Sequence, residues 1–267
     1  MTERGEFAAH CRDGDHVIKT LNEQHPAGTR FVAAAQNVGI TGMHRYLRTL
    51  RAAGVTLPPD LSVVSAEPLA VRHRWVPGPR LLDCAHADSA RFIDGVVEIA
   101  RWVRALDRTD ARLDTNLANF CLADEHVVLV DVLPPLIPSA SPEPSNLFEV
   151  LFRALCFDTS VTLDALVGYA VRALLQSRAS VALGERDALA RQVSADVAKV
   201  STAVFPASWF RARVVLGLRA LAGDIASEVV QEFFVLTSVR VFRDLPEKDR
   251  ADRITQVGHA MKELVLA

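Results

Sequence analysis

The periodicity of the apolar residues changes once along this chain, near residue 80. Before that point, short runs with strand-like character are separated by turn residues, and Asp13-Gly14 stands between two of them. A DG pair in that position is a strong local signal for a β-hairpin. From residue 88 onward, apolar residues recur at spacings of three and four, the period of an α-helix. The chain is therefore expected to have an α+β fold.

The first part is expected to form a small β-rich lobe over residues 1–79. Its predicted elements are strands over 7–12, 16–21, 61–65 and 69–76, with one helix over 41–53. Gly54 ends that helix, and Pro77-Gly78-Pro79 forms a hinge.

The second part, residues 80–267, is expected to form a larger helical lobe with an embedded β-hairpin over 113–132. Asn146 with Glu149 three residues later has the pattern of a capping box that opens a helix. Aromatic residues between 205 and 242 lie at helical spacings and are expected in the core, although a substrate-facing wall is the alternative. Breaks between the later helices are expected at Asp158, Gly184, Pro206, Gly223 and Pro246.

Charge and composition exclude several classes of function. A formal net charge of −2 over 267 residues gives no basic surface for a phosphate backbone, so no nucleic-acid partner is expected. No run of about 18 apolar residues exists, so no membrane span is expected. The four cysteines are far apart and form no CxxC pair, which favours a reducing, cytoplasmic location over a disulfide framework.

Three polar residues have the spacing of a phosphoryl-transfer site. Asn119 follows Asp114 by five residues, and Asp131 ends the apolar run that begins at Val127. In phosphoryl transfer, one carboxylate orients the attacking hydroxyl and can take its proton, while an amide oxygen and a second carboxylate hold Mg²⁺ against the nucleotide phosphates. A hairpin between these residues would bring all three side chains together.

This pattern resembles the catalytic segment of the protein-kinase-like fold, in its aminoglycoside phosphotransferase and choline kinase branch. The resemblance implies a two-lobed fold that uses ATP and Mg²⁺, with Asp114 as the catalytic residue and Asn119 and Asp131 as the metal ligands. Lys19, in Val17-Ile18-Lys19, looks like the strand lysine that contacts the α- and β-phosphates. Residues 41–53 look like the αC helix, and Trp75 and Val76 look like part of the segment that lines the adenine pocket.

The same resemblance implies transfer of a phosphate to a hydroxyl of a small molecule or of Ser/Thr in a biosynthetic precursor peptide. Two departures from the pattern of this family leave a second class of function open. The segment 41–53 holds no acidic partner for Lys19, and only four residues precede Gly5, where a glycine-rich loop would end. The alternative is a pseudokinase that binds a partner enzyme or peptide without turnover. The missing loop also leads us to expect a protein partner that completes the small lobe.

Each site residue also has a purely structural interpretation. Asp114 could be a turn or helix-cap residue, because Asp favours both positions. Lys19 could be a solvated strand lysine. The alternating Arg72-His73-Arg74 is interpreted as a half-exposed strand rather than as nucleotide contacts.

Overall fold

The chain is described by a computed structural model over residues 2–4, 8–22, 28–124 and 126–266. Gly5-Glu6-Phe7, expected to end a glycine-rich loop and to begin a strand, lie outside the described residues. The fold is α+β, as the sequence predicts. The chain forms two compact units, of which the first comprises residues 1–81, 101–114 and 118–143, and the second comprises 82–100, 115–117 and 144–267.

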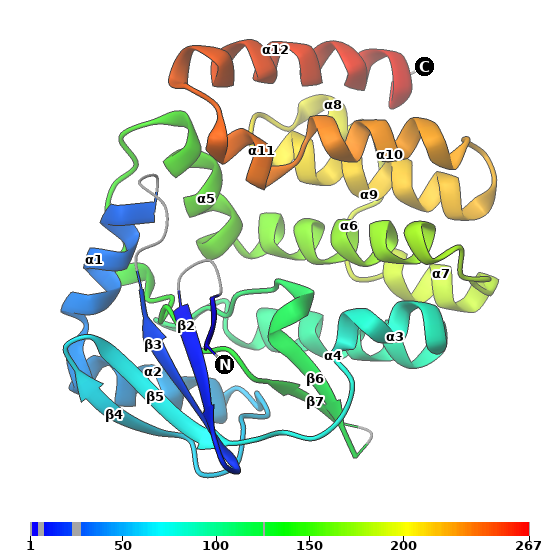
Figure 1. Cartoon of the computed structure of the whole chain (residues 1–267). Coiled ribbons are helices and arrows are strands. Elements are labelled where there is room, and N and C mark those ends of the chain that lie inside the picture. The colour runs from blue at the N-terminus through cyan, green and yellow to red at the C-terminus, as the bar shows by residue number, and fades with distance from the viewer. Residues whose placement is uncertain (1, 5–7, 23–27, 125, 267) are drawn as a thin grey trace. The chain divides into compact units, whose positions relative to one another are not determined.

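The first unit contains a five-stranded antiparallel sheet in the order β1-β2-β3-β5-β4 (Figure 1). Its strands are β1 (Thr2–Arg4), β2 (Ala8–Asp13), β3 (His16–Leu21), β4 (Ser62–Ala66) and β5 (Leu69–Arg74). The predicted hairpin is confirmed, because β2 pairs with β3 down to Asp13 opposite His16. Gly14 in the turn has φ 58°, a conformation that glycine adopts without steric cost. The later pair of predicted strands corresponds to β4 and β5.

Two consecutive helices connect β3 to β4. The predicted helix over 41–53 is α2 (Gly39–Ala52), whereas α1 (Thr29–Asn37) was not predicted. The sequence of α1 has only a short apolar stripe, and its position depends on a tertiary contact made by Gln36. The side-chain amide of Gln36 donates to the carbonyl oxygen of Ala66 and accepts from the amide of Leu69, 2.9 Å away. It therefore joins α1 to the turn between β4 and β5.

A β-hairpin also packs within the first unit. It consists of β6 (Phe120–Ala123) and β7 (His126–Leu129), inside the range 113–132 where a hairpin was predicted. The amide of Leu122 donates to the carbonyl oxygen of Pro79 at 2.9 Å, and the amide of Leu129 donates to that of Thr56 at 3.0 Å. Because the hairpin belongs to this unit, the two units divide the chain at other points than the predicted lobes 1–79 and 80–267.

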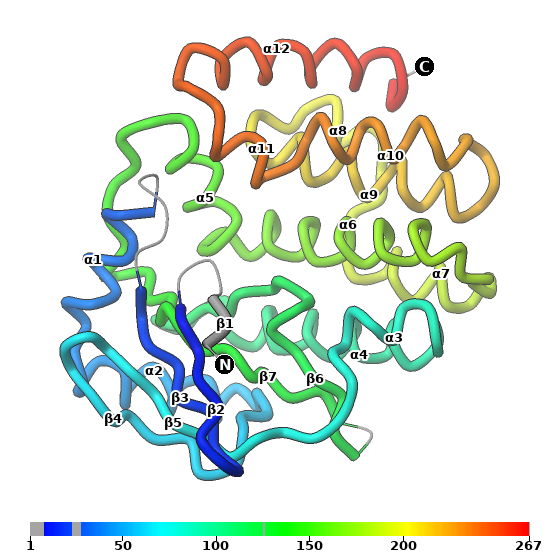
Figure 2. Tube along the Cα trace, viewed as in Figure 1, coloured from blue at the N-terminus to red at the C-terminus, as the bar shows by residue number. Residues whose placement is uncertain are grey.

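The second unit is helical, and Figure 2 traces its path. Its helices are α3 (Leu81–Ala87), α4 (Ser89–Ala105, whose last turn belongs to the first unit), α5 (Leu147–Phe157), α6 (Thr159–Ser177), α7 (Leu183–Ala190), α8 (Val197–Thr202), α9 (Ala207–Ala222), α10 (Ser227–Leu236), α11 (Val239–Asp244) and α12 (Glu247–Leu264). Helices α6 and α9 lie side by side and bury most of their residues. Of the six aromatic side chains expected in the core, Phe205 is only half-buried. The other five are buried, and they are Trp209, Phe210, Phe233, Phe234 and Phe242.

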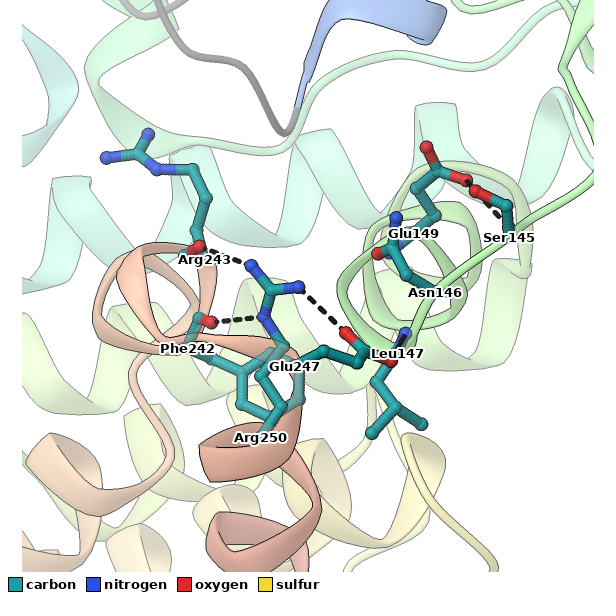
Figure 3. A network of polar contacts seen from close by, with 8 residues as sticks. All are labelled: Ser145, Asn146, Leu147, Glu149, Phe242, Arg243, Glu247 and Arg250. Carbon is teal, nitrogen blue, oxygen red and sulfur yellow. Dashed lines mark hydrogen bonds and ion pairs between the residues drawn. The ribbon is translucent and has the colours of Figure 1, made fainter.

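The beginning of α5 confirms the predicted cap and adds a contact (Figure 3). Asn146 caps the helix by accepting a hydrogen bond from the amide of Glu149, 2.9 Å away. The Glu149 carboxylate in turn accepts from the amide and hydroxyl of Ser145. The amide of Leu147 donates to Glu247 of α12 at 2.9 Å, so the free amides of the first turn have partners from two segments.

Four of the five predicted helix breaks are confirmed. Asp158 caps α6, Pro206 and Pro246 precede α9 and α12, and Gly223 ends α9 with φ 85°. The break predicted at Gly184 is wrong, since Gly184 is the second residue of α7. The chain turns instead at Arg178, which adopts the left-handed conformation after α6.

Two arginines of α9, one half-buried and one fully buried, contact α6 in the second unit. Arg211 of α9 pairs with Asp164 of α6 at 2.8 Å. Arg213 is fully buried, with its guanidinium about 5 Å from the ring centroids of Tyr169 and Phe234. None of the helices within the described residues has an apolar stretch sufficient to cross a bilayer.

Candidate functional site

Lys19 lies on the buried face of β3. In this strand Val17, Lys19 and Leu21 are buried, while the residues between them are partly exposed. Lysine is seldom buried without a partner, because a desolvated ammonium loses its hydration. The partner is Asp131, whose Oδ2 lies 3.1 Å from Nζ, and the two side chains are only 10% and 20% exposed. The alternative of a solvated strand lysine is therefore wrong.

Asp131 is positioned by the β6–β7 hairpin. It lies two residues beyond the end of β7, and its Oδ1 accepts a hydrogen bond from the amide of Leu133 at 3.3 Å. The amide of Val130 donates to the carbonyl oxygen of Asn119 at 2.8 Å, so the pairing continues one residue past the strands. Asn119 and Asp131 consequently flank the same open end of the hairpin.

Asp114 is joined to Asn119 directly. The Nδ2 of Asn119 donates to Oδ2 of Asp114 at 2.9 Å. Asn119 is the last residue of the short 3-10 helix η2 (Leu117–Asn119), which leads into β6. Because the side-chain nitrogen of Asn119 donates to Asp114, the side-chain oxygen of Asn119 has lone pairs available for a cation or a hydrogen-bond donor. The structure thus brings the four predicted polar residues together in two pairs, Lys19 with Asp131 and Asn119 with Asp114, within one unit.

The segment before Asp114 is held by Arg112, which sequence reasoning missed. Its guanidinium donates to the carbonyl oxygens of four residues at 2.7–2.8 Å, and these are Leu106, Asp107, Thr109 and Ala111. Its backbone amide donates to Leu136, and its carbonyl oxygen accepts from the hydroxyl of Tyr46 at 2.8 Å. Arginine can organise a loop in this way because it carries five donors in a fixed plane. The signal available in the sequence was an arginine in a loop, two positions before the candidate catalytic residue Asp114.

His73 was assigned to a half-exposed strand rather than to nucleotide contacts. The alternation Arg72-His73-Arg74 does form part of β5, but His73 is only 3% exposed. Its Nδ1 lies 2.8 Å from the carbonyl oxygen of Arg74. Burial lowers the pKa of this imidazole, the positive charge of Lys19 lowers it further, and the negative charge of Asp131 acts in the opposite direction. His73 is therefore electrostatically coupled to the Lys19–Asp131 pair.

Trp75 and Val76 follow β5 directly. Val76 is buried, whereas Trp75 is 46% exposed, and the guanidinium of Arg12 lies 4.5 Å from the centroid of its ring. Gly78 has φ 121°, and a Cβ there would overlap the carbonyl oxygen of Leu122. This close approach lets the segment after Val76 run against β6. Trp75 is thus placed by Arg12, while Val76 is part of the packed interior of the unit.

The oxygen atoms of Asn119 and Asp131 are of the kind that Mg²⁺ prefers. Across the described parts of the chain, no three His, Cys, Asp or Glu side chains are close enough to hold a metal ion by themselves. Magnesium usually keeps one or two carboxylate ligands and completes its shell with water and substrate phosphates. The oxygen atoms of Asn119 and Asp131 therefore fit a magnesium ion that is bound together with a polyphosphate. They are too few to hold a structural metal ion tightly.

No protein-family model matches this chain, and no curated protein matches it either. The resemblance to the protein-kinase-like fold accordingly rests on the residues described above.

Proposed function

We propose that this protein transfers the γ-phosphate of ATP to a hydroxyl group, either on a small molecule or on Ser/Thr of a biosynthetic precursor peptide. The observation that carries the proposal is the ion pair between Lys19 and Asp131 at 3.1 Å. A buried strand lysine beside the carboxylate that follows a hairpin suits a site for nucleotide phosphates, because the cation binds phosphate oxygens and the carboxylate binds their metal ion.

Each side chain has a distinct role in this proposal. Lys19 binds the α- and β-phosphates, and the oxygen atoms of Asn119 and Asp131 hold Mg²⁺. When bound, ATP supplies the phosphoryl group and the metal ion neutralises charge on its phosphates. Asp114 orients the acceptor hydroxyl and takes its proton. The hydrogen bond from Asn119 keeps Asp114 in one orientation and leaves the amide oxygen of Asn119 available to hold the metal ion.

The element order supports a protein-kinase-like fold for the whole chain. The strand that carries Lys19 is followed by two helices, two strands and a hinge-like segment, and later by a hairpin that leads to Asp131. In this proposal, residues 1–79 form a reduced small lobe and 80–267 form the helical lobe. Trp75 and Val76 line the adenine pocket. A cytoplasmic location and a partner protein that completes the small lobe stay predictions.

A second candidate is a pseudokinase that binds a partner enzyme or a peptide without phosphoryl transfer. The observation that favours it concerns the acidic partner of Lys19. Neither α1 nor α2 contains an acidic residue, so neither can supply the carboxylate that usually holds this lysine. Lys19 is paired with Asp131 instead, and that pairing places an ammonium beside the oxygen atoms proposed for Mg²⁺.

A titration of thermal stability with ATP and Mg²⁺, together and apart, tests nucleotide binding. A ligand that binds only the native state raises its stability. We expect ATP with Mg²⁺ to raise the melting temperature more than the sum of the separate effects, and Asp131→Asn to remove that excess. Absence of any stabilisation in the wild type would refute the phosphotransferase and leave the binding module as the candidate. Transfer of labelled γ-phosphate to hydroxyl acceptors then separates the enzyme from the binding module.

A further inference from the structure

His73 carries a buried polar atom without a partner. Its Nε2 makes no hydrogen bond to any residue in the described ranges, although the residue is only 3% exposed. Buried polar atoms in folded proteins are nearly always hydrogen-bonded, so an exception at a candidate site calls for an explanation. The question is which chemical group this nitrogen would accept.

The protonation of the ring follows from its other contact. A carbonyl oxygen can only accept a hydrogen bond, so Nδ1 must donate to the carbonyl of Arg74, 2.8 Å away. Burial lowers the pKa of His73 and so favours the neutral imidazole, although the hydrogen bond to Arg74 acts in the opposite direction. In a neutral ring with the proton on Nδ1, Nε2 has a lone pair and no hydrogen. It can accept a hydrogen bond and cannot donate one.

The register of the sheet places His73 on the same buried face as Lys19. Lys19 lies opposite Val71, and His73 lies opposite Val17, so Lys19 and His73 lie on the same buried face of neighbouring strands. Along β5, His73 is two residues beyond the level of Lys19, in the direction of Val76. His73 therefore lies between Lys19, which is proposed to bind the phosphates, and Trp75 and Val76, which are proposed to line the adenine pocket.

We propose that Nε2 of His73 accepts a hydrogen bond from the exocyclic amino group of adenine and so selects ATP over 6-oxopurine nucleotides. The inference rests on the proposed function, because it requires a nucleotide at Lys19. An amino group at C6 satisfies the buried lone pair. A carbonyl oxygen at C6 instead presents a second acceptor and leaves both atoms unsatisfied. A metal ion at Nε2 is disfavoured by the neighbouring positive charge of Lys19.

The test compares ATP with ITP, which has a carbonyl oxygen in place of the amino group at C6 and a hydrogen on N1. Affinities of the full chain for each nucleotide are measured by calorimetry with Mg²⁺ present. The wild type is expected to bind ATP about tenfold more tightly than ITP, the ratio that corresponds to one buried hydrogen bond. In His73→Leu the ratio should fall to about one through loss of ATP affinity. In His73→Gln, whose amide both accepts and donates, ATP affinity should be kept and ITP affinity should rise.

The matched control is His126→Leu, since His126 is an exposed histidine on β7 of the same unit. This substitution should leave the ratio of ATP affinity to ITP affinity the same as in the wild type. Equal binding of ATP and ITP by the wild type, or a preference that survives His73→Leu, would overturn the inference and leave the proposed function standing. No saturable binding of either nucleotide would overturn both.

Discussion

Nζ of Lys19 lies 3.1 Å from the carboxylate of Asp131, and this ion pair connects the middle strand of the sheet to the end of the β6–β7 hairpin. Both side chains are largely removed from water. Removal of one partner of such a pair leaves the other as an uncompensated charge, whereas removal of both does not. Loss of either partner alone should therefore destabilise the first unit even without a ligand.

We expect Lys19→Met and Asp131→Asn each to lower the free energy of unfolding, by roughly 1–3 kcal/mol. The double variant should lose clearly less than the sum of the two, because the second substitution removes the charge that the first one left unpaired. Urea unfolding of the four proteins without nucleotide or metal measures this coupling. Additive losses would show that the two charges do not interact in solution.

Asp114→Ala separates the enzyme from the binding module. If Asp114 orients the acceptor hydroxyl, its removal should lower the single-turnover rate of phosphate transfer by about two to four orders of magnitude. ATP affinity should change little, because Asp114 contacts the acceptor rather than the nucleotide.

The control for this variant lies in the same segment. Asp110 accepts hydrogen bonds from the amide and the hydroxyl of Ser139, at 2.9 and 2.6 Å, and so has a structural role. Asp110→Ala should reduce stability and leave the transfer rate of the folded protein unchanged. A full transfer rate in Asp114→Ala would exclude the catalytic role.

Local patterns predicted most of the strands and the candidate site residues. The sequence Val17-Ile18-Lys19 alternates as a strand, and a DG turn precedes it, so both the hairpin and the residue could be found. The spacing of Asp114, Asn119 and Asp131 singled out three side chains that form two contacts in the structure.

Tertiary contacts account for what local patterns missed. Nothing near Lys19 in sequence shows that its partner is Asp131, because that contact depends on where the hairpin packs. Likewise, the alternation around His73 predicts a strand and does not show which face is buried. Helix α1 was missed since its position depends on Gln36 bonding to the turn between β4 and β5.

Gly78→Ala should be strongly destabilising. The residue has φ 121°, which side chains rarely adopt, and a Cβ would overlap the backbone oxygen of Leu122. Backbone cannot move aside as a flexible side chain can, so the loss should exceed about 2 kcal/mol.

Gly14→Ala is the control, because Gly14 also has a positive φ but no atom near the site of its Cβ. It should lose only about 1 kcal/mol, the cost of the left-handed conformation alone. Equal losses in urea unfolding would contradict the steric explanation.

The final prediction concerns the pH dependence of stability in the second unit. Burial raises the pKa of Asp164 from its ordinary value to about 6, although the charge of Arg211 and its hydrogen bond to the carboxylate act in the opposite direction. Between about pH 4 and pH 6 the native state then binds more protons at this residue than the unfolded chain does. The contribution of Asp164 to stability is thus fully present below the unfolded pKa and is lost as the pH rises through the folded pKa.

Asp164→Asn isolates this contribution, since the amide does not titrate and other carboxylates are common to both proteins. The free energy of unfolding of the wild type minus that of the variant should fall as the pH rises from 4 to 7, by a total of about 3 kcal/mol for a two-unit shift. Urea unfolding at half-unit pH intervals measures the difference. A constant difference would mean that Asp164 titrates alike in both states, and an increase with pH would mean that its pairing with Arg211 outweighs its burial.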